Sequence, residues 1–515
     1  MKKLIILLLL ATASNAFSQD WPVKKIVMEK KAKLVSFKNM PAFSFVADKP
    51  LGQRGIYQEL RLNSSFIEQL LNQKPEALQL KIPLSNTSSI TCELVRFTLG
   101  NVKFTQNNTD VIENVKIPVT YRGIVSGVAG RNNVMLTVNE DYLSLAVTMT
   151  EKVIQITKAD ESVKSTYRLY NSTRIKFPSA LPGCGTKESP ALTRADGIDL
   201  RGGQDRPASS ENKCVYVFVD CFDSVFIWRN RSVPQTINYV YELFNAVSTG
   251  YVNERINILI TTINIWSTMD PYRNDNRENS LYDLAYKWKD SFWGNICVGL
   301  DYGQNHSGLA GGIGTVKGVP VNICPVFNYN ATDSISASCY SDLNYGGTYD
   351  SFPTGPNTTQ AQVYLVMHEM GHLLGSAHTH WCGWLLSAGF PPVIGALDNC
   401  AATEGGCPPG AAPPGGKGTI MSYCNIGALV SFNRGFGEQP GNAIRNYVDQ
   451  NSCVPGCIIC TGLIFETSDG NSLAAASFSS PASLPANGPV PLTVPPMNAV
   501  IPVKKDAGLI QKANQ

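Results

Sequence analysis

Four of the five histidines of this 515-residue chain lie in one short stretch, "HEMGHLLGSAHTH", residues 368–380. His368 and His372 are four positions apart, so on a helix their side chains point to the same side, one turn apart. Two imidazoles at that spacing can bind one Zn²⁺ ion at about 2.0–2.1 Å. Glu369 follows the first histidine directly, where a general base for a metal-bound water belongs. The pattern predicts a catalytic zinc site.

A third ligand is expected after the end of this helix. Gly375 should terminate it, because glycine adopts the positive φ of a C-terminal cap without steric cost. The chain can then turn back and supply His378. Three histidine ligands leave the fourth position open, which distinguishes a catalytic zinc from a structural one. His380 is a hydrogen-bonding neighbour of the ligands, a surface residue or a competing third ligand, and the spacing from Gly375 favours His378.

The chemistry expected of such a site is hydrolysis. Zinc lowers the pKa of its bound water to roughly 7, so a nucleophile is present at neutral pH. Glu369 would take the proton as the water attacks a carbonyl, and then pass it to the leaving amine.

The surrounding pattern predicts the elements that position these residues. Thr359 and Gln362 form a T-x-x-Q capping box, and no helix breaker follows until Gly375. Upstream, strand-like and amphipathic helical patterns alternate, which favours an α/β (α+β) domain with helices packed on a twisted, mostly parallel sheet. The expected strands are residues 214–220 and 256–266, and the expected helices are residues 233–252 and 281–293.

The spacing His368-Glu369-x-x-His372-x-x-Gly375-x-x-His378 resembles that of the metzincin zinc peptidases. Further motifs are similar to the secreted bacterial reprolysin-like (adamalysin-like) members of that clan: "TMDPY" (268–272), "GLAGG" (308–312), "HTHWCGW" (378–384), "ALDNC" (396–400) and "FGEQPGNAIR" (436–445). The resemblance implies a metzincin-like catalytic domain over residues 212–455, with one zinc ion and with protein or peptide substrates.

The resemblance also implies roles for residues outside the zinc motif. Met421, in "GTIMSYC", would form the Met-turn below the metal. Tyr423 would be a reversible fifth ligand or a transition-state hydrogen-bond donor, although it is equally a candidate core tyrosine. Gly308, Leu309 and Ala310 would form the edge strand that pairs with the substrate backbone, unless this glycine-rich stretch is only a turn.

Residues 20–200 are expected to form a mostly β pro-domain. Period-two alternation predicts strands within residues 134–150 and 152–158, and one helix is expected at residues 65–72. Cys184, in "LPGCGTKE", resembles the cysteine switch of these peptidases, in which a thiolate fills the open zinc position. A Cys92–Cys184 disulfide is the alternative.

A polar linker, residues 186–213, follows the candidate switch, and its composition is typical of segments that proteases cut. Cleavage near Arg194, Arg201 or Arg206 would release the latch.

The two ends of the chain and its cysteines indicate where it acts. Residues 1–19 read as a signal peptide, with cleavage between residues 16 and 19, so we expect a secreted protein. Twelve of the fourteen cysteines fall between Cys214 and Cys460, which favours six disulfides in an oxidising compartment. Residues 461–515 are rich in Ala, Ser and Pro and are expected to be a flexible tail.

Composition narrows the partners and cofactors. The net charge of +3, without long blocks of one sign, argues against nucleic-acid binding, and no further stretch is apolar enough to cross a bilayer. Calcium is possible, because Asp398 lies near candidate loops. The oligomeric state does not follow from the sequence. The alternative function is a catalytically silent adhesion or binding protein on a peptidase scaffold, against which the glutamate at Glu369 argues.

Overall fold

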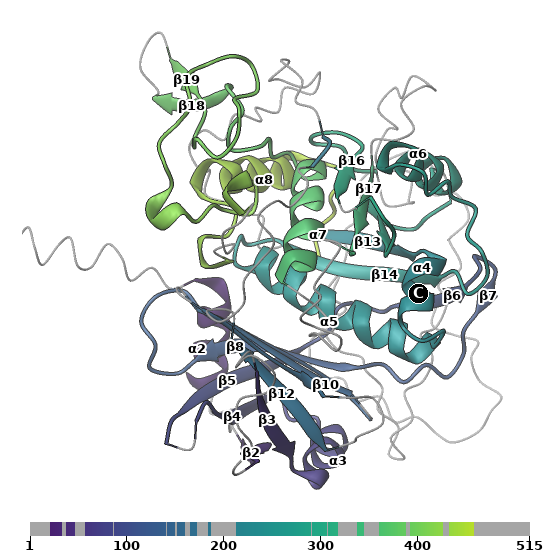
Figure 1. The fold of residues 1–515 in the computed structure, drawn as a ribbon, viewed down its shortest axis with the longest axis vertical. Helices are drawn as coiled ribbons and strands as arrows, with labels where there is room; N and C mark the ends of the chain where they lie inside the picture. Colours follow the sequence, from purple (N-terminus) through teal and green to yellow (C-terminus); the bar gives the residue numbers. More distant parts are fainter. Residues whose placement is uncertain are drawn as a thin grey trace, which may run out of the picture. The chain divides into compact units, whose positions relative to one another are not determined.

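The structure is a computed structural model (Figure 1). It describes residues 21–32, 38–46, 57–85, 87–140, 142–149, 152–159, 165–171, 184–186, 213–289, 291–305, 307–317, 337–344, 360–387, 392–425 and 432–457. The expected signal peptide, most of the linker, the capping residue Thr359 and the tail therefore lie outside the described residues.

The N-terminal region is built around a ten-stranded sheet in the order β1-β4-β5-β8-β9-β10-β11-β12-β3-β2. Its strand pairs are antiparallel except β1 with β4. Its elements are α2 (Pro22–Ala32), β1 (Lys38–Pro41), β2 (Phe43–Phe45), β3 (Tyr57–Leu62), α3 (Ser64–Gln73), β4 (Ala77–Pro83), β5 (Ser89–Phe97), β8 (Val119–Val125), β9 (Asn133–Asn139), β10 (Tyr142–Thr148), β11 (Val153–Lys158) and β12 (Thr166–Asn171). The expectation of a mostly β region is confirmed.

The second sheet has seven strands in the order β16-β17-β15-β13-β14-β6-β7. Its strands are β6 (Lys103–Gln106), β7 (Asp110–Val111), β13 (Cys214–Cys221), β14 (Asn257–Ile265), β15 (Ile296–Asp301), β16 (Gly308–Ala310) and β17 (Ser338–Asp342). The pairs are parallel except at the two ends, where β16 and β7 run antiparallel to their neighbours. Every residue of β13 is buried, as expected of a central strand with both faces covered. The predicted mostly parallel sheet is confirmed.

Helices pack on this sheet (Figure 1). They are α4 (Asp223–Trp228), α5 (Val233–Val252), α6 (Arg277–Trp288) and α7 (Gln360–Leu373). A further helix, α8 (Glu438–Gln450), contributes Ile444, Tyr447 and Val448 to the same hydrophobic core. A short hairpin joins β18 (Trp384–Ser387) to β19 (Val393–Gly395). The start of α5 is capped by the Ser232 side chain, which accepts a hydrogen bond from the Gln235 amide. The Tyr251 hydroxyl donates to the Met367 carbonyl at 3.0 Å, so α5 holds the helix that carries the zinc motif.

Two features of the N-terminal region differ from the sequence expectation. Residues 22–32 form the helix α2, which the alternation did not predict. The strands β6 and β7, although they lie between strands of the first sheet in sequence, belong to the second sheet and not to the first. The N-terminal region is therefore not a separate β domain throughout, because its β6–β7 hairpin completes the sheet of the following region.

The prediction of six disulfides is wrong. Among the described cysteines, bonds join Cys214 to Cys457, Cys382 to Cys407 and Cys400 to Cys424. Buried thiols remain at three strand positions, Cys221, Cys297 and Cys339, because a free cysteine packs as a small apolar side chain. Within the described part of the chain, no helix has the length and apolar character needed to span a membrane.

The Cys214–Cys457 bond should be a main contributor to stability, because it joins residues 243 positions apart. Replacing both cysteines with alanine should lower the free energy of unfolding by about 2–5 kcal/mol and lower the thermal midpoint accordingly. Cys221→Ala, which removes one buried thiol from the same strand, is the matched control with a smaller expected loss. Equal midpoints for the two variants would contradict this assignment.

Candidate metal centre

The three histidines of the motif converge on one point. His368 and His372 project from α7, and His378 follows the helix. The Nε2 atom of His372 lies 3.2 Å from Nε2 of His368 and 3.1 Å from Nε2 of His378. All three side chains are buried. At a Zn–N distance of about 2.0–2.1 Å, tetrahedral coordination requires nitrogens about 3.3 Å apart, close to what is observed.

The hydrogen bonds of the three Nδ1 atoms indicate that this cluster is suited to binding a cation. Nδ1 of His368 faces the Ile420 carbonyl at 2.7 Å, Nδ1 of His372 faces the Ser376 carbonyl at 2.8 Å, and Nδ1 of His378 faces Glu404 at 3.1 Å. Each acceptor fixes the proton on Nδ1 and leaves a lone pair on Nε2. Three lone pairs directed at one another repel unless a positive ion lies between them. Burial lowers the pKa of His368 to about 3, so its ring is neutral, as metal binding requires.

The end of α7 positions the third histidine. The helix ends at Leu373, and Gly375 has a φ of 103°, a conformation that favours glycine. The predicted helix end at Gly375 is confirmed. Beyond this turn the chain reverses, and the indole of Trp384 donates to the His378 carbonyl at 2.7 Å. His378 is thereby held facing the helix.

Met421 lies directly against α7. A methyl group added at Gly371 would be 2.8 Å from the Met421 sulfur, so a larger residue at this position would require the Met421 side chain to shift. Met421 is fully buried, and its carbonyl accepts from the Thr379 amide at 3.1 Å. The preceding carbonyl, of Ile420, is the acceptor for His368. The segment thus supports both sides of the histidine cluster.

Cys184 lies beside the histidines, not beside Cys92. Its sulfur is 3.5 Å from Nε2 of His372, and the ligand atoms of Cys184 and the three motif histidines all lie within 4.8 Å of one another. Cys92 is buried in the core of the N-terminal sheet and has no disulfide partner. The alternative of a Cys92–Cys184 bond is therefore wrong.

The residues after Cys184 run along β16. The Gly185 amide donates to the Gly308 carbonyl at 3.2 Å, and the Thr186 hydroxyl accepts from the Ala310 amide at 2.9 Å. Gly308, Leu309 and Ala310 form the end strand of the second sheet rather than an isolated turn. The edge expected to hold a substrate backbone therefore contacts a segment of the N-terminal region.

The side chain of Glu369, a residue of α7, is fully buried and faces Gly308 of β16. Its Oε2 accepts a hydrogen bond from the Cys184 thiol at 3.2 Å, whereas Oε1 has no hydrogen-bond partner among the residues that the structure describes. A methyl group at Gly308 would lie 2.3 Å from Oε1, so the glycine leaves this carboxylate its space. Burial raises the pKa of Glu369 to about 8, opposed by the hydrogen bond from Cys184.

Glu404 is a residue that the sequence reasoning missed. It contacts Nδ1 of His378 at 3.1 Å and Nε2 of His380 at 3.3 Å. Burial opposes its ionisation, but the hydrogen bonds from His378 and His380 outweigh this and lower the pKa of Glu404 to about 2. Glu404 follows His378 by 26 positions in a loop, where no sequence periodicity marks it.

His380 turns away from the cluster and contacts Glu404. It is buried, and its ring stacks on His378 with centroids 4.9 Å apart. Of the three interpretations of His380, the surface residue is wrong, and the geometry favours a neighbour that orients the carboxylate over a competing ligand.

Tyr423 also faces the cluster. Its hydroxyl is 3.2 Å from Nε2 of His378 and donates to the Cys184 carbonyl at 2.8 Å. Burial raises the pKa of Tyr423, so the hydroxyl stays protonated. A role only in the core does not account for this position.

Asp398 has a structural role in its loop. Its carboxylate accepts from the Cys400 amide at 3.2 Å and from the Ser422 hydroxyl at 2.6 Å. These bonds tie the loop to the segment after Met421. Calcium binding stays an untested prediction.

Comparison with known proteins agrees with this geometry. Residues 211–433 match the model of Metallo-peptidase family M12. This part of the chain is therefore similar to that family. The prediction of a reprolysin-like metallopeptidase is thus confirmed at the level of the family.

Two similar proteins place this match in context. The human "Disintegrin and metalloproteinase domain-containing protein 33" is 23% identical over 261 residues, which are 50% of this chain and 27% of that protein. The chain therefore spans about a quarter of the relative it matches. A solved structure, metalloproteinase-II from Bacteroides fragilis, is 10% identical with a TM-score of 0.37, covering 66% of this chain and 89% of that one. A TM-score this low does not establish that the two proteins share a fold.

Glu404 should affect metal affinity without binding the metal. Glu404→Gln removes the charge that orients His378 and should weaken zinc binding about 10–100-fold, measured by equilibrium competition with a chromogenic chelator. Glu438→Gln, an exposed change at the start of α8, is the control and should leave the affinity unchanged. Equal affinities for both variants would refute the role of Glu404.

Proposed function

We propose that this chain is a secreted zinc-dependent endopeptidase that is made as a latent precursor. The observation that carries the proposal is the convergence of three Nε2 atoms, with Glu369 beside them and Cys184 within 4.8 Å of the histidine nitrogens. His368, His372 and His378 would hold the zinc, and residues 212–455 would form the catalytic domain. Protein or peptide substrates follow from the peptidase family.

The chain's own residues would then perform the proton transfers. A bound zinc ion supplies Lewis acidity and lowers the pKa of a water molecule to about 7. Glu369 would remove a proton from the attacking water and later donate it to the leaving amine. Its Oε1 atom, without a partner among the described residues, is available for the attacking water.

Substrate binding would use β16 and Tyr423. An extended peptide would pair with the backbone of Gly308 and Ala310, as residues 185 and 186 do in the precursor. The protonated Tyr423 hydroxyl, near His378, would donate to the oxygen that gains negative charge in the transition state.

Latency would come from Cys184. As a thiolate, its sulfur would complete the ligand set of the three histidines, and its neighbours would cover the substrate edge. The thiol also hydrogen-bonds Glu369. One residue would thus block both the metal and the general base, and a cut within residues 187–212 would break the covalent link between Cys184 and the catalytic domain.

Secretion is proposed from the N-terminus and the disulfides. Residues 1–19 combine two lysines, an apolar run and small residues, the order of a signal peptide. The three disulfides of the described region require an oxidising compartment to persist.

Removal of the proposed general base should abolish turnover while zinc is retained. Glu369→Ala, in mature enzyme, should lower kcat about 10²–10⁴-fold, because no other described carboxylate lies against the Nε2 cluster. Metal content by mass spectrometry and peptide hydrolysis by fluorescence would be measured on the same sample, with Glu438→Ala as control. A fully active, zinc-loaded variant would disprove the assigned base.

Removal of the proposed latch should activate the precursor. Uncleaved Cys184→Ala should hydrolyse a quenched peptide, whereas the uncleaved wild-type precursor should not. Cys92→Ala, which removes the other cysteine of the N-terminal region, should stay latent. If the Cys184→Ala precursor folds, binds zinc and remains inactive, the switch is wrong.

A further inference from the structure

We propose that residues 99–111, here called the anchor segment, hold the N-terminal region on the catalytic domain after the linker between them has been cut. Their binding surface is the outer edge of β14 and the apolar core behind it. The inference rests on the proposed latency and adds that cleavage of the linker alone does not release the inhibitor.

The anchor segment completes the second sheet. Its strand β6 pairs in parallel with β14 over four residues, from Lys103 opposite Thr262 to Gln106 opposite Ile265. The Leu99 carbonyl accepts from the Ile260 amide at 2.6 Å, and the Asn107 amide donates to the Ile265 carbonyl at 3.0 Å. Figure 1 places β6 and β7 at the edge of the teal strands. Without β6, β14 would present a row of unpaired backbone groups.

The anchor segment also fills the core of the catalytic domain. Leu99, Val102 and Phe104 are 1%, 8% and 5% exposed, and all three belong to the hydrophobic cluster of α5, α7 and the second sheet. The Phe104 ring stacks on Tyr241 of α5 with centroids 6.4 Å apart. Withdrawing these side chains would expose apolar surface on both partners, at a cost of roughly 1.5–3 kcal/mol for each large side chain.

The contact between the N-terminal sheet and α5 differs from that of the anchor segment because it includes many polar groups. The N-terminal sheet meets α5 through several buried polar groups and through a smaller apolar cluster that joins Val95 and Ile124 to Val252. Glu242 accepts hydrogen bonds from Tyr142, Ser144 and Gln155, and the Asn253 side chain donates to Asn133 at 2.7 Å. Water can replace such contacts when the surfaces separate.

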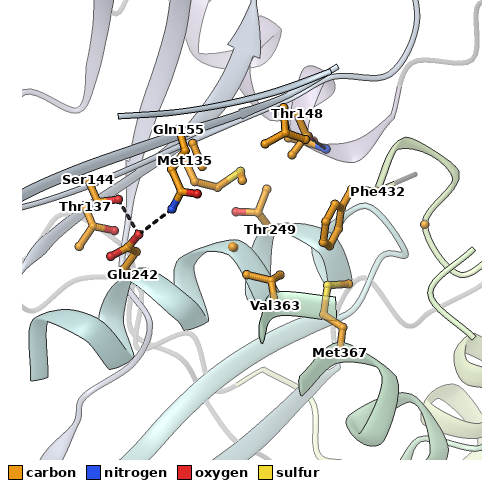
Figure 2. Close-up of a pocket in the computed structure, with 16 residues that line it drawn as sticks. Met135, Thr137, Ser144, Thr148, Gln155, Glu242, Thr249, Val363, Met367 and Phe432 are labelled. Carbon is orange, nitrogen blue, oxygen red and sulfur yellow. Dashed lines mark hydrogen bonds between the residues drawn. The ribbon is translucent and has the colours of Figure 1, made fainter. Parts of the chain in front are cut away.

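A cavity interrupts the same interface (Figure 2). It is lined from the N-terminal sheet by residues such as Met135 and Thr148, and from the helices by Thr249, Val363 and Met367. The Thr249 hydroxyl is buried and has no hydrogen-bond partner within the described region. Incomplete packing and an unsatisfied hydroxyl weaken this contact, whereas the anchor segment combines strand pairing with burial of three apolar side chains in the core.

This arrangement separates attachment from inhibition. Cys184 precedes the linker, so after a cut within residues 187–212 it stays on the same fragment as the anchor segment. As long as the anchor segment remains bound, Cys184 is kept at high effective concentration beside the zinc ligands. Full activation then requires a second event that removes the anchor segment, such as a cut within it.

The test uses the full chain with a recognition sequence for a site-specific protease inserted between residues 200 and 203, in a Glu369→Gln background that prevents self-digestion. After complete cutting, native mass spectrometry and size-exclusion chromatography at micromolar concentration should find the two fragments together. Hydrogen exchange should show residues 103–106 and 257–265 still protected. Separate fragments, or loss of protection at β14 on cutting, would overturn the proposal.

A matched pair of variants assigns the attachment to the anchor segment. Phe104→Ala should speed fragment dissociation at least about tenfold, whereas Val111→Ala, at an exposed position of the same hairpin, should not. Equal dissociation rates would overturn the assignment to Phe104, and hydrogen exchange at β14 tests the segment if Phe104→Ala fails to fold. These measurements follow fragment association, so they stand even if no peptide is hydrolysed, which would instead contradict the proposed function.

Discussion

The mutual repulsion of three imidazole lone pairs is the constraint on which the site depends. Nε2 atoms 3.1–3.2 Å apart are stable only around a cation, so the fold must hold the rings in place from behind. It does so through three acceptors from different segments: the end of α7 at Ser376, the loop at Glu404 and the segment at Ile420. The last two segments lie outside helices and strands, so other interactions must hold their backbones in place.

Two disulfides hold these segments in place. Cys382–Cys407 closes the loop that carries Glu404, and Cys400–Cys424 joins that loop to the segment next to Tyr423. Because both bonds lie near the acceptors for His378 and His368, the irregular half of the site is held covalently. The helical half is held by packing, including the close contact between Gly371 and Met421. An oxidising compartment is thus a condition for the metal site as well as for stability.

What could be predicted from the sequence was local. His368, His372 and Gly375 could be placed because helical geometry fixes neighbours within one or two turns. Glu404 could not be found, since its contact with His378 depends on the path of a disulfide-bonded loop. The count of six disulfides failed because cysteines such as Cys221 and Cys297 follow the apolar pattern of their strands, and sequence does not distinguish a packed thiol from a bonded one.

The β6 hairpin escaped prediction for a related reason. Its residues alternate like those of the neighbouring strands, but its partner, β14, lies about 160 positions away, and nothing in the pattern indicates which sheet it joins. As a result, the N-terminal region contacts both ends of the second sheet, and the two contacts differ in kind. At β16, residues 185 and 186 make a few hydrogen bonds, which suits the proposal that a substrate replaces them at this edge. At β14, pairing and apolar burial are combined, which suits an edge that catalysis does not use. In the proposed latent precursor, strong attachment at β14 would permit weak contacts at β16, and the N-terminal region would not need to bind tightly at the position that it blocks.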